Sequence, residues 1–239
     1  MNGLSREGLA TPTHEMDIAR VIERMTAIAA GLAPDDGVAR FNDLYLTVTR
    51  AVAQEAVDDA FEDPHFLSLL DVVFAGRYFA AIDDSLQGRP VSRAWVPLFE
   101  ERARPRVAPI QFALAGMNAH INYDLCLALV ESCAQMGLAP DSDSAQHRDY
   151  LRVNGIIERV QGQVQERFAT GLLSVADEAL GRLDDILAMW KVARARDSAW
   201  THAQALWALR DLPSLRTDYL AALGGLVGLV GRGLLTPTL

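Results

Sequence analysis

Two side chains that can exchange a proton lie four residues apart in an otherwise apolar segment. His120 and Asp124 occur within VAPIQFALAGMNAHINYDLCLALVESCAQMG, residues 107–137, and Asp124 is the only residue between 106 and 131 that is charged at neutral pH. Because each residue turns an α-helix by about 100°, residues four apart share one face. A histidine oriented by a carboxylate is suited to general acid/base catalysis. We therefore expect His120 to act as acid or base, with Asp124 as its orienting partner.

The same pair has two other interpretations. Histidine and aspartate one helical turn apart can both ligate a metal ion, but a metal centre needs a third and a fourth ligand. His147, Asp149 and Glu158 are the nearest candidates along the chain, and no HExxH, paired ExxH or CxxC motif is present. We therefore assign no cofactor and no metal ligand, with a metal at the pair as an alternative. The third interpretation is a buried polar network that joins neighbouring helices.

A second group of candidates lies on the segment VVFAGRYFAAIDD. Arg77 is a cation in an apolar stretch, so it should meet a carboxylate or an anionic ligand. Tyr78 and Asp83 are candidate substrate-binding residues on the same helix. The doublet of Asp83 and Asp84 resembles aspartate-rich magnesium motifs, but Gln87 stands where a third aspartate is needed. We therefore assign no magnesium site there.

Three further polar residues are expected to bind substrate or to complete a polar network. Asn122 follows His120 by two residues and lies toward the opposite side of the same helix. Asp149 and Asn154 lie in HRDYLRVNGIIERV, where Asn154 stands among branched aliphatic residues. A buried amide needs hydrogen-bond partners, and the middle helix can provide them.

These residues must be positioned by helices, because helical periodicity covers nearly the whole chain and no alternating strand pattern occurs. We predict one all-α domain over residues 1–239, a multi-helix bundle around a buried central helix at about 107–137, with residues 1–12 flexible. Three glycines at 224, 228 and 231 predict close packing of the last helix. The expected helices span about 14–32, 38–52, 64–86, a short segment near 95–99, 107–137, 145–168, 172–196, 200–210 and 213–233.

Composition limits the partners and the compartment. The net charge of −9 argues against a nucleic-acid partner, which usually requires a basic face. Polar residues near the centre of the middle helix argue against a membrane span. The N-terminus has no apolar signal sequence, and two cysteines on one helix, Cys126 and Cys133, fit free thiols in a reducing compartment. We expect a soluble, cytoplasmic protein, and the sequence says nothing of its oligomeric state.

The motif AGMNAHINYDL resembles a bacterial family catalogued as domain of unknown function number 5995. The upstream GRYFAAIDD, the Ala94-Trp95 pair and the downstream DYLRVNGII carry the same resemblance, which extends from about Phe41 to Leu235. It implies that His120, Asn122 and Asp124, with Asp149 and Asn154 downstream, meet at one site. It implies no activity.

The leading functional hypothesis is therefore an enzyme with acid/base chemistry in an apolar helical pocket, of the lyase, cyclase or isomerase type, in biosynthesis or specialised metabolism. Its partner would be a small, largely apolar molecule, with Arg77 holding an anionic group. One alternative is a metal-dependent hydrolase with His120 and Asp124 as ligands. Another is a non-catalytic helical binding or scaffold protein.

Overall fold

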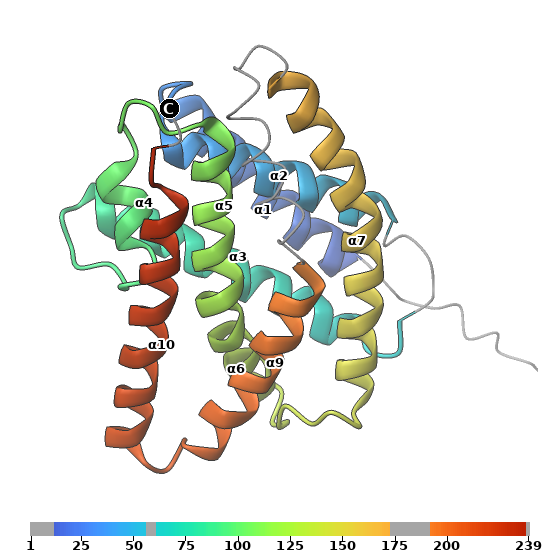
Figure 1. Cartoon of the computed structure of the whole chain (residues 1–239). Helices are drawn as coiled ribbons and strands as arrows, with labels where there is room; N and C mark the ends of the chain where they lie inside the picture. Colours follow the sequence, from blue (N-terminus) through green and yellow to red (C-terminus); the bar gives the residue numbers. More distant parts are fainter. Residues whose placement is uncertain (1–11, 56–60, 173–191, 238–239) are drawn as a thin grey trace, which may run out of the picture.

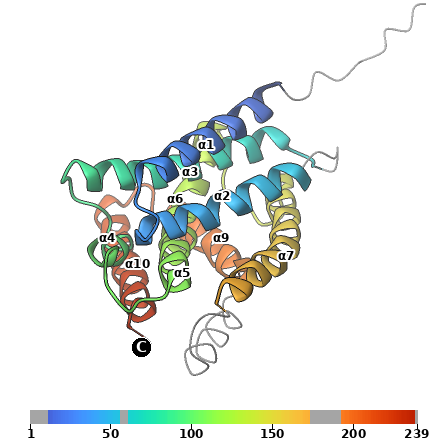
Figure 2. The same ribbon diagram turned by 90° about the horizontal axis from the view of Figure 1, so that it is seen from above.

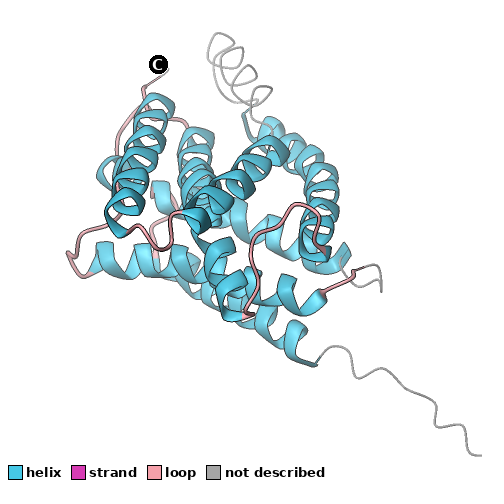
Figure 3. Ribbon diagram, turned by 90° about the horizontal axis from the view of Figure 1, so that it is seen from below, coloured by secondary structure: helices cyan, strands magenta, loops and turns pink. Residues whose placement is uncertain are grey.

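The computed structural model describes residues 12–55, 61–172 and 192–237. Every regular element in these ranges is a helix, which confirms the all-α prediction (Figure 3). The N-terminal residues expected to be flexible lie almost entirely outside the described residues, as does most of the helix predicted at 172–196. The helices are α1 (Pro12–Gly31), α2 (Gly37–Glu55), α3 (Pro64–Leu86), α4 (Val96–Glu101), α5 (Pro109–Ala119), η1 (His120–Asp124), α6 (Leu125–Gln135), α7 (Ala145–Leu172), α9 (Val192–Ala208) and α10 (Pro213–Leu234).

The predicted central helix consists of α5, η1 and α6, and the other helices surround it. α2 and α10 pack against α5, while α3 and α9 pack against α6 (Figure 1). Seen from above, α1, α2 and α3 lie near one another, and α10 and α9 lie on opposite sides of α5 (Figure 2). Nearly all of α5 is buried, from Ile110 to Ala119. The central position that the sequence predicts is thus confirmed.

Local signals in the sequence fix several helix ends. Asp63 caps α3, since its carboxylate accepts a hydrogen bond from the backbone N–H of Phe66, and Pro64 follows at the first helical position. Gly137 adopts a φ of 68° just after α6, where a residue with a side chain would be strained. Both ends lie where the sequence predicts them.

The middle helix differs from the prediction in its interior. The sequence predicts one uninterrupted α-helix, whereas residues His120–Asp124 form a π-helical turn between α5 and α6. A π turn replaces the usual hydrogen bond to the fourth residue with one to the fifth, and such turns often lie at functional sites. The backbone N–H of Leu125 accordingly donates to the carbonyl of His120. The two candidate catalytic side chains are the first and last residues of this turn.

A second difference concerns the helix before the C-terminal one. The sequence predicts a helix ending near 196 and a new one from 200, but α9 runs without a break from Val192 to Ala208. The polar run RARDS has no glycine or proline to stop a helix, and its buried positions follow helical spacing. The predicted break was therefore wrong.

Glycines allow the closest helix contacts. A Cβ atom added to Gly116 on α5 would lie 2.3 Å from the Phe41 ring of α2. On α10, a Cβ atom at Gly228 would lie 2.4 Å from the carbonyl oxygen of Arg93, ahead of α4. The close packing predicted for the last helix is thus confirmed.

One described helix, α3, is long and apolar enough to cross a membrane by length and composition alone. Core helices of globular proteins pass the same test, so this is a weak indication. In the structure, α3 contacts α1, α6 and α7.

Candidate functional site

The π turn brings His120 and Asp124 into direct contact. The Nδ1 atom of His120 lies 3.1 Å from Oδ2 of Asp124, and the indole N–H of Trp95 donates to the same oxygen over 2.9 Å. All three side chains are almost completely buried, with His120 only 1 % exposed. Two donors on one carboxylate explain how Asp124 is tolerated inside the protein.

The contact with Asp124 determines which nitrogen of His120 is available. A carboxylate only accepts hydrogen bonds, so the neutral imidazole carries its proton on Nδ1 and its lone pair on Nε2. Among the described residues, Nε2 of His120 is buried and has no hydrogen-bond partner. Nε2 is therefore a basic nitrogen without a hydrogen-bond partner among the described residues, on an imidazole that Asp124 orients through Nδ1.

Aromatic rings surround the imidazole. The ring of Phe74 stacks on it with centroids 3.6 Å apart and planes 4° apart, and Tyr45 meets it edge-on at 4.7 Å. Burial lowers the pKa of His120, opposed by the hydrogen bond and charge of Asp124, while the charge of Arg77 lowers it further. The imidazole is thus kept neutral at physiological pH, as a proton acceptor must be.

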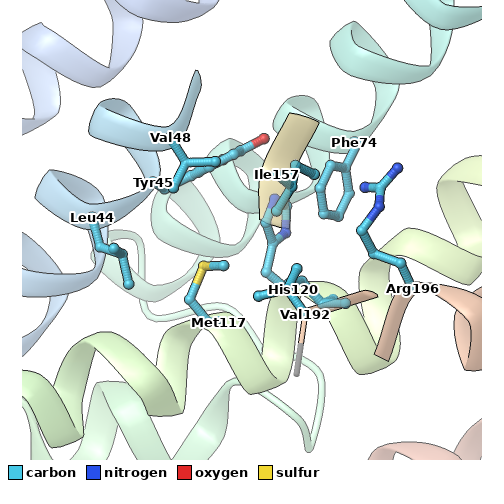
Figure 4. Close-up of a pocket in the computed structure, with 10 residues that line it drawn as sticks. Leu44, Tyr45, Val48, Phe74, Met117, His120, Ile157, Val192 and Arg196 are labelled. Carbon is cyan, nitrogen blue, oxygen red and sulfur yellow. The ribbon is translucent and has the colours of Figure 1, made fainter. Parts of the chain in front are cut away.

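His120 lies at the wall of an apolar cavity. The cavity has a volume of about 70 Å³ and is bounded by α2, α3, α5, η1, α7 and α9. Figure 4 shows Met117 and His120 facing this space, with Phe74 beside the imidazole. For comparison, an engineered cavity of about 150 Å³ takes up benzene. The space next to His120 therefore fits a group of a few non-hydrogen atoms. Its lining consists of Leu44, Tyr45, Val48, Phe74, Met117, His120, Ile121, Ile157, Val192 and Arg196.

Several predicted site residues contact other parts of the molecule instead. The Nδ2 group of Asn122 donates to Asn118, whose own amide donates to the carbonyl of Val227 in α10. Asp149 accepts hydrogen bonds from the backbone N–H groups of residues 62 and 63 and from Arg152. These side chains join different parts of the chain and do not line the cavity of His120.

The candidates on α3 likewise do not line the cavity. Arg77 forms an ion pair with Glu131 at 2.5 Å and is partly exposed. The Tyr78 hydroxyl donates to the buried amide of Asn42, although the Tyr78 ring also lies 6.0 Å from the His120 ring. Asp83 forms an exposed ion pair with Arg24.

Asn154 leads to a residue that the sequence interpretation missed. Its side-chain oxygen accepts a 2.5 Å hydrogen bond from Nε of Arg196, which lines the His120 cavity and is only 6 % exposed. Arg196 follows Val192 and precedes Ala199 and Ala203 at helical spacing, and all four are buried. This buried spacing is visible in the sequence, but the helix break predicted after 196 separated Arg196 from Ala199 and Ala203 on the same helix face.

Trp95 was also missed as a functional contact, because a tryptophan beside apolar residues looks like a core residue. It is one, at 1 % exposure, but its N–H also holds Asp124 in place. For metal binding, the described residues contain no group of three or more histidine, cysteine, aspartate or glutamate side chains suited to hold an ion. The metal alternative therefore has two ligands and no third in this part of the chain.

Comparison with known proteins places the chain in a family. A model of a family described as "Family of unknown function (DUF5995)" matches residues 18–237, nearly the whole chain. No curated protein and no solved structure matches at a significant level.

Proposed function

Since the chain belongs to DUF5995, a family of unknown function, we propose a function from the geometry of its buried site. The proposed protein is an enzyme that moves a proton on a small, largely apolar molecule, in a reaction of the lyase, cyclase or isomerase type. The observation that carries the proposal is the unpartnered Nε2 of His120 at the wall of an apolar cavity. An apolar cavity with few polar groups is the usual form of a small-molecule site.

In the proposed mechanism, Nε2 of His120 takes a proton from a C–H or O–H bond of the substrate. The resulting imidazolium keeps its Nδ1–H bond to Asp124, whose negative charge stabilises the new positive charge. Nε2 then returns the proton to a different atom of the substrate, so that the enzyme ends unchanged. Trp95 contributes by fixing the position of the Asp124 carboxylate.

Two further observations support the proposal. An unsatisfied buried nitrogen costs about 1–3 kcal/mol, so its presence needs a reason that stability does not provide. The π turn at residues 120–124 also interrupts regular α-helical hydrogen bonding at the position of the histidine. We propose that this enzyme is cytoplasmic and acts in biosynthesis or specialised metabolism.

The second candidate is a non-catalytic helical binding or scaffold protein. The enclosure of His120 and the hydrogen bond from Trp95 to Asp124 favour it, because both fit a polar contact that joins the start of α4 to the middle helix. The two candidate functions make different predictions for Nε2 of His120. In a structural network this nitrogen would form a hydrogen bond with the protein, whereas a proton acceptor must keep its lone pair free.

Turnover of a small molecule tests the proposal directly. Purified wild-type protein, His120→Gln and His65→Gln are each incubated with a small-molecule extract of bacterial cells, and the extracts are compared by mass spectrometry. His65 is an exposed histidine at the start of α3, so its variant is the matched control. We expect a compound that the wild type and His65→Gln convert and His120→Gln leaves unchanged. Identical extracts from all three proteins would favour the scaffold alternative.

A further inference from the structure

The buried guanidinium of Arg196 has no anionic partner in the described part of the chain. Its Nε–H donates to Asn154, and its Cζ atom lies 4.3 Å from the centroid of the Tyr150 ring. These contacts use one of five N–H donors. No ion pair joins Arg196 to a carboxylate of a described residue, although the residue is only 6 % exposed.

A buried cation without an anion is costly. Removing a guanidinium from water costs several kcal/mol, and neither one neutral hydrogen bond nor one aromatic face restores that loss. The other arginines for which the structure gives ion pairs, such as Arg77 with Glu131 and Arg102 with Asp36, are more exposed than Arg196. Arg196 is therefore more deeply buried than any of these paired arginines, and the structure gives it no ion pair with a described residue.

Arg196 lines two cavities. One is the apolar cavity of His120, and the other is a cavity of about 30 Å³ bounded by α1, α2, α3, α6, α7 and α9. Phe74 belongs to both linings, so the imidazole and the guanidinium lie on either side of one shared wall residue (Figure 4). Arg196 is thus the charged residue that the linings of the two cavities share.

Two polar neighbours affect what this place can bind. Asp71 lines the smaller cavity together with Arg196 and lowers the net positive charge there. Tyr45 lines the larger cavity; burial raises its pKa, the charge of Asp71 raises it further, and the charge of Arg196 lowers it. The phenol is thus a neutral donor within electrostatic range of the guanidinium. The carboxylate of Asp71 should therefore disfavour a multiply charged ligand such as phosphate more strongly than a singly charged one.

We infer that Arg196 binds the carboxylate of a small monocarboxylic acid whose apolar chain occupies the His120 cavity. A carboxylate accepts two parallel hydrogen bonds from a guanidinium, which matches the donors that Arg196 has left. The anion-binding role that the sequence suggested for Arg77 thus belongs to Arg196. The inference rests on the proposed function only in using the same cavity, and it specifies the substrate class as a carboxylic acid.

Binding of matched probes tests the inference. Unbranched carboxylates from acetate to hexanoate and the corresponding neutral amides are titrated into ¹⁵N-labelled protein, and affinities are taken from NMR chemical-shift changes. Each pair has the same size and differs in charge. At least one carboxylate should bind the wild type about tenfold more tightly than its amide, the effect of one charge-assisted contact. The Nε–H signal of Arg196 should shift with that carboxylate and not with its amide.

Variants of Arg196 complete the test. Arg196→Gln keeps a hydrogen-bonding group for Asn154, and Arg196→Met keeps the apolar length; both should lose the preference for carboxylate. Arg196→Lys keeps the positive charge and should retain part of the preference for carboxylate. Arg210→Met, which removes an exposed arginine packed on Trp207, is the matched control and should behave as the wild type.

Three results would overturn the inference. They are equal affinity for every carboxylate and its amide, an unchanged Arg196 signal, and a preference that survives in both uncharged variants. If neither uncharged variant folds, the Arg196 signal of the wild type decides. His120→Gln separates this inference from the proposed function, because it should keep the carboxylate preference while losing turnover. Carboxylate binding without turnover would thus refute only the enzyme.

Discussion

The Oδ2 atom of Asp124 is the atom that both other polar side chains of the candidate site contact. It receives the N–H groups of Trp95 and His120, so the same atom fixes the position of the indole and the tautomer of the imidazole. Because Nδ1 is engaged there, any chemistry of His120 takes place at Nε2, on the other side of the ring. In the proposed mechanism, the carboxylate at position 124 thus orients the histidine without contacting the substrate.

The lowered pKa of His120 predicts a loss of stability in acid. Below its ordinary pKa of 6.5, the histidine takes up a proton in the unfolded chain but not in the folded protein. The stability contributed by the neutral imidazole is therefore complete above about pH 6.5, and it falls as the pH drops toward the folded pKa. The loss is at most about 1.4 kcal/mol per pH unit.

Urea unfolding of the wild type and His120→Gln between pH 7.5 and 5 measures this effect. The wild-type free energy of unfolding should fall more steeply with acid than that of the variant, below about pH 6.5. Asp124 and Arg77, the charged groups that act on His120, are present in both proteins, so the difference between the slopes isolates the imidazole. Parallel slopes would mean that the folded and unfolded histidines have the same pKa.

At the scale of single elements, contact between α2 and α5 depends on a missing side chain. Gly116→Ala would place a methyl group 2.3 Å from the Phe41 ring, so we expect the variant to lose about 1–3 kcal/mol of stability from overpacking. Gly76→Ala on α3 is the matched control, since nothing lies within 4 Å of its added Cβ atom.

The control should change stability in the opposite direction. Alanine is favoured over glycine in a helix by about 0.5–1 kcal/mol, so Gly76→Ala should raise the melting temperature. Thermal unfolding of both variants, followed by circular dichroism, provides the comparison. Two variants of equal stability would show that α2 and α5 can separate at no cost.

The thiols of α6 are expected to be inert. Burial raises the pKa of Cys126 to about 12 and that of Cys133 to about 11, so almost no thiolate forms at neutral pH. Native protein should therefore not react with iodoacetamide at pH 7.5 over an hour, whereas both thiols should react in urea. Mass spectrometry counts the added groups, and labelling of the native protein would reveal local opening of α6.

Which elements the sequence could predict depended on how local their signals are. The start of α3 needs only Asp63 and Pro64, and the contact between positions 120 and 124 needs only helical spacing. Arg196 needed a correct interpretation of α9, because its burial is visible only against the apolar residues on both sides of it. The ion pair of Arg77 with Glu131 joins two helices 54 residues apart, and spacing within one helix does not predict it.

At the scale of the whole molecule, the C-terminal helix completes the core. Gln111 on α5 donates to the carbonyls of Leu234 and Thr236, and Asn118 donates to that of Val227. A chain ending at Asp211 would remove these three hydrogen-bond acceptors from the two buried amides and would uncover apolar α5. We expect it to lose cooperative thermal unfolding.

The outer face of α10 is the control for that truncation. Leu229 is 68 % exposed, so Leu229→Ser should change the free energy of unfolding by no more than about 0.5 kcal/mol. Calorimetry of the truncated chain and of Leu229→Ser distinguishes the effect of losing α10 from the effect of losing an apolar side chain on its surface. A truncated chain that still unfolds in one sharp transition would show that the remaining helices form a self-sufficient core.

The π turn also has a consequence for insertions and deletions along the chain. A turn of this kind holds one residue more than the α-helix needs, so each residue of α6 is offset by about 100° from its position in an uninterrupted α-helix of the same sequence. This offset lets the single rod present one set of side chains to α2 and α10 and another to α3 and α9. Loss of one residue between 120 and 124 would restore a regular α-helix in which α5 and α6 still face the same neighbours, because a π turn and an α turn cover nearly the same rotation. Insertion of one residue would instead rotate α6 by about 100° and turn it away from α3 and α9. The segment should therefore tolerate loss of one residue better than gain of one.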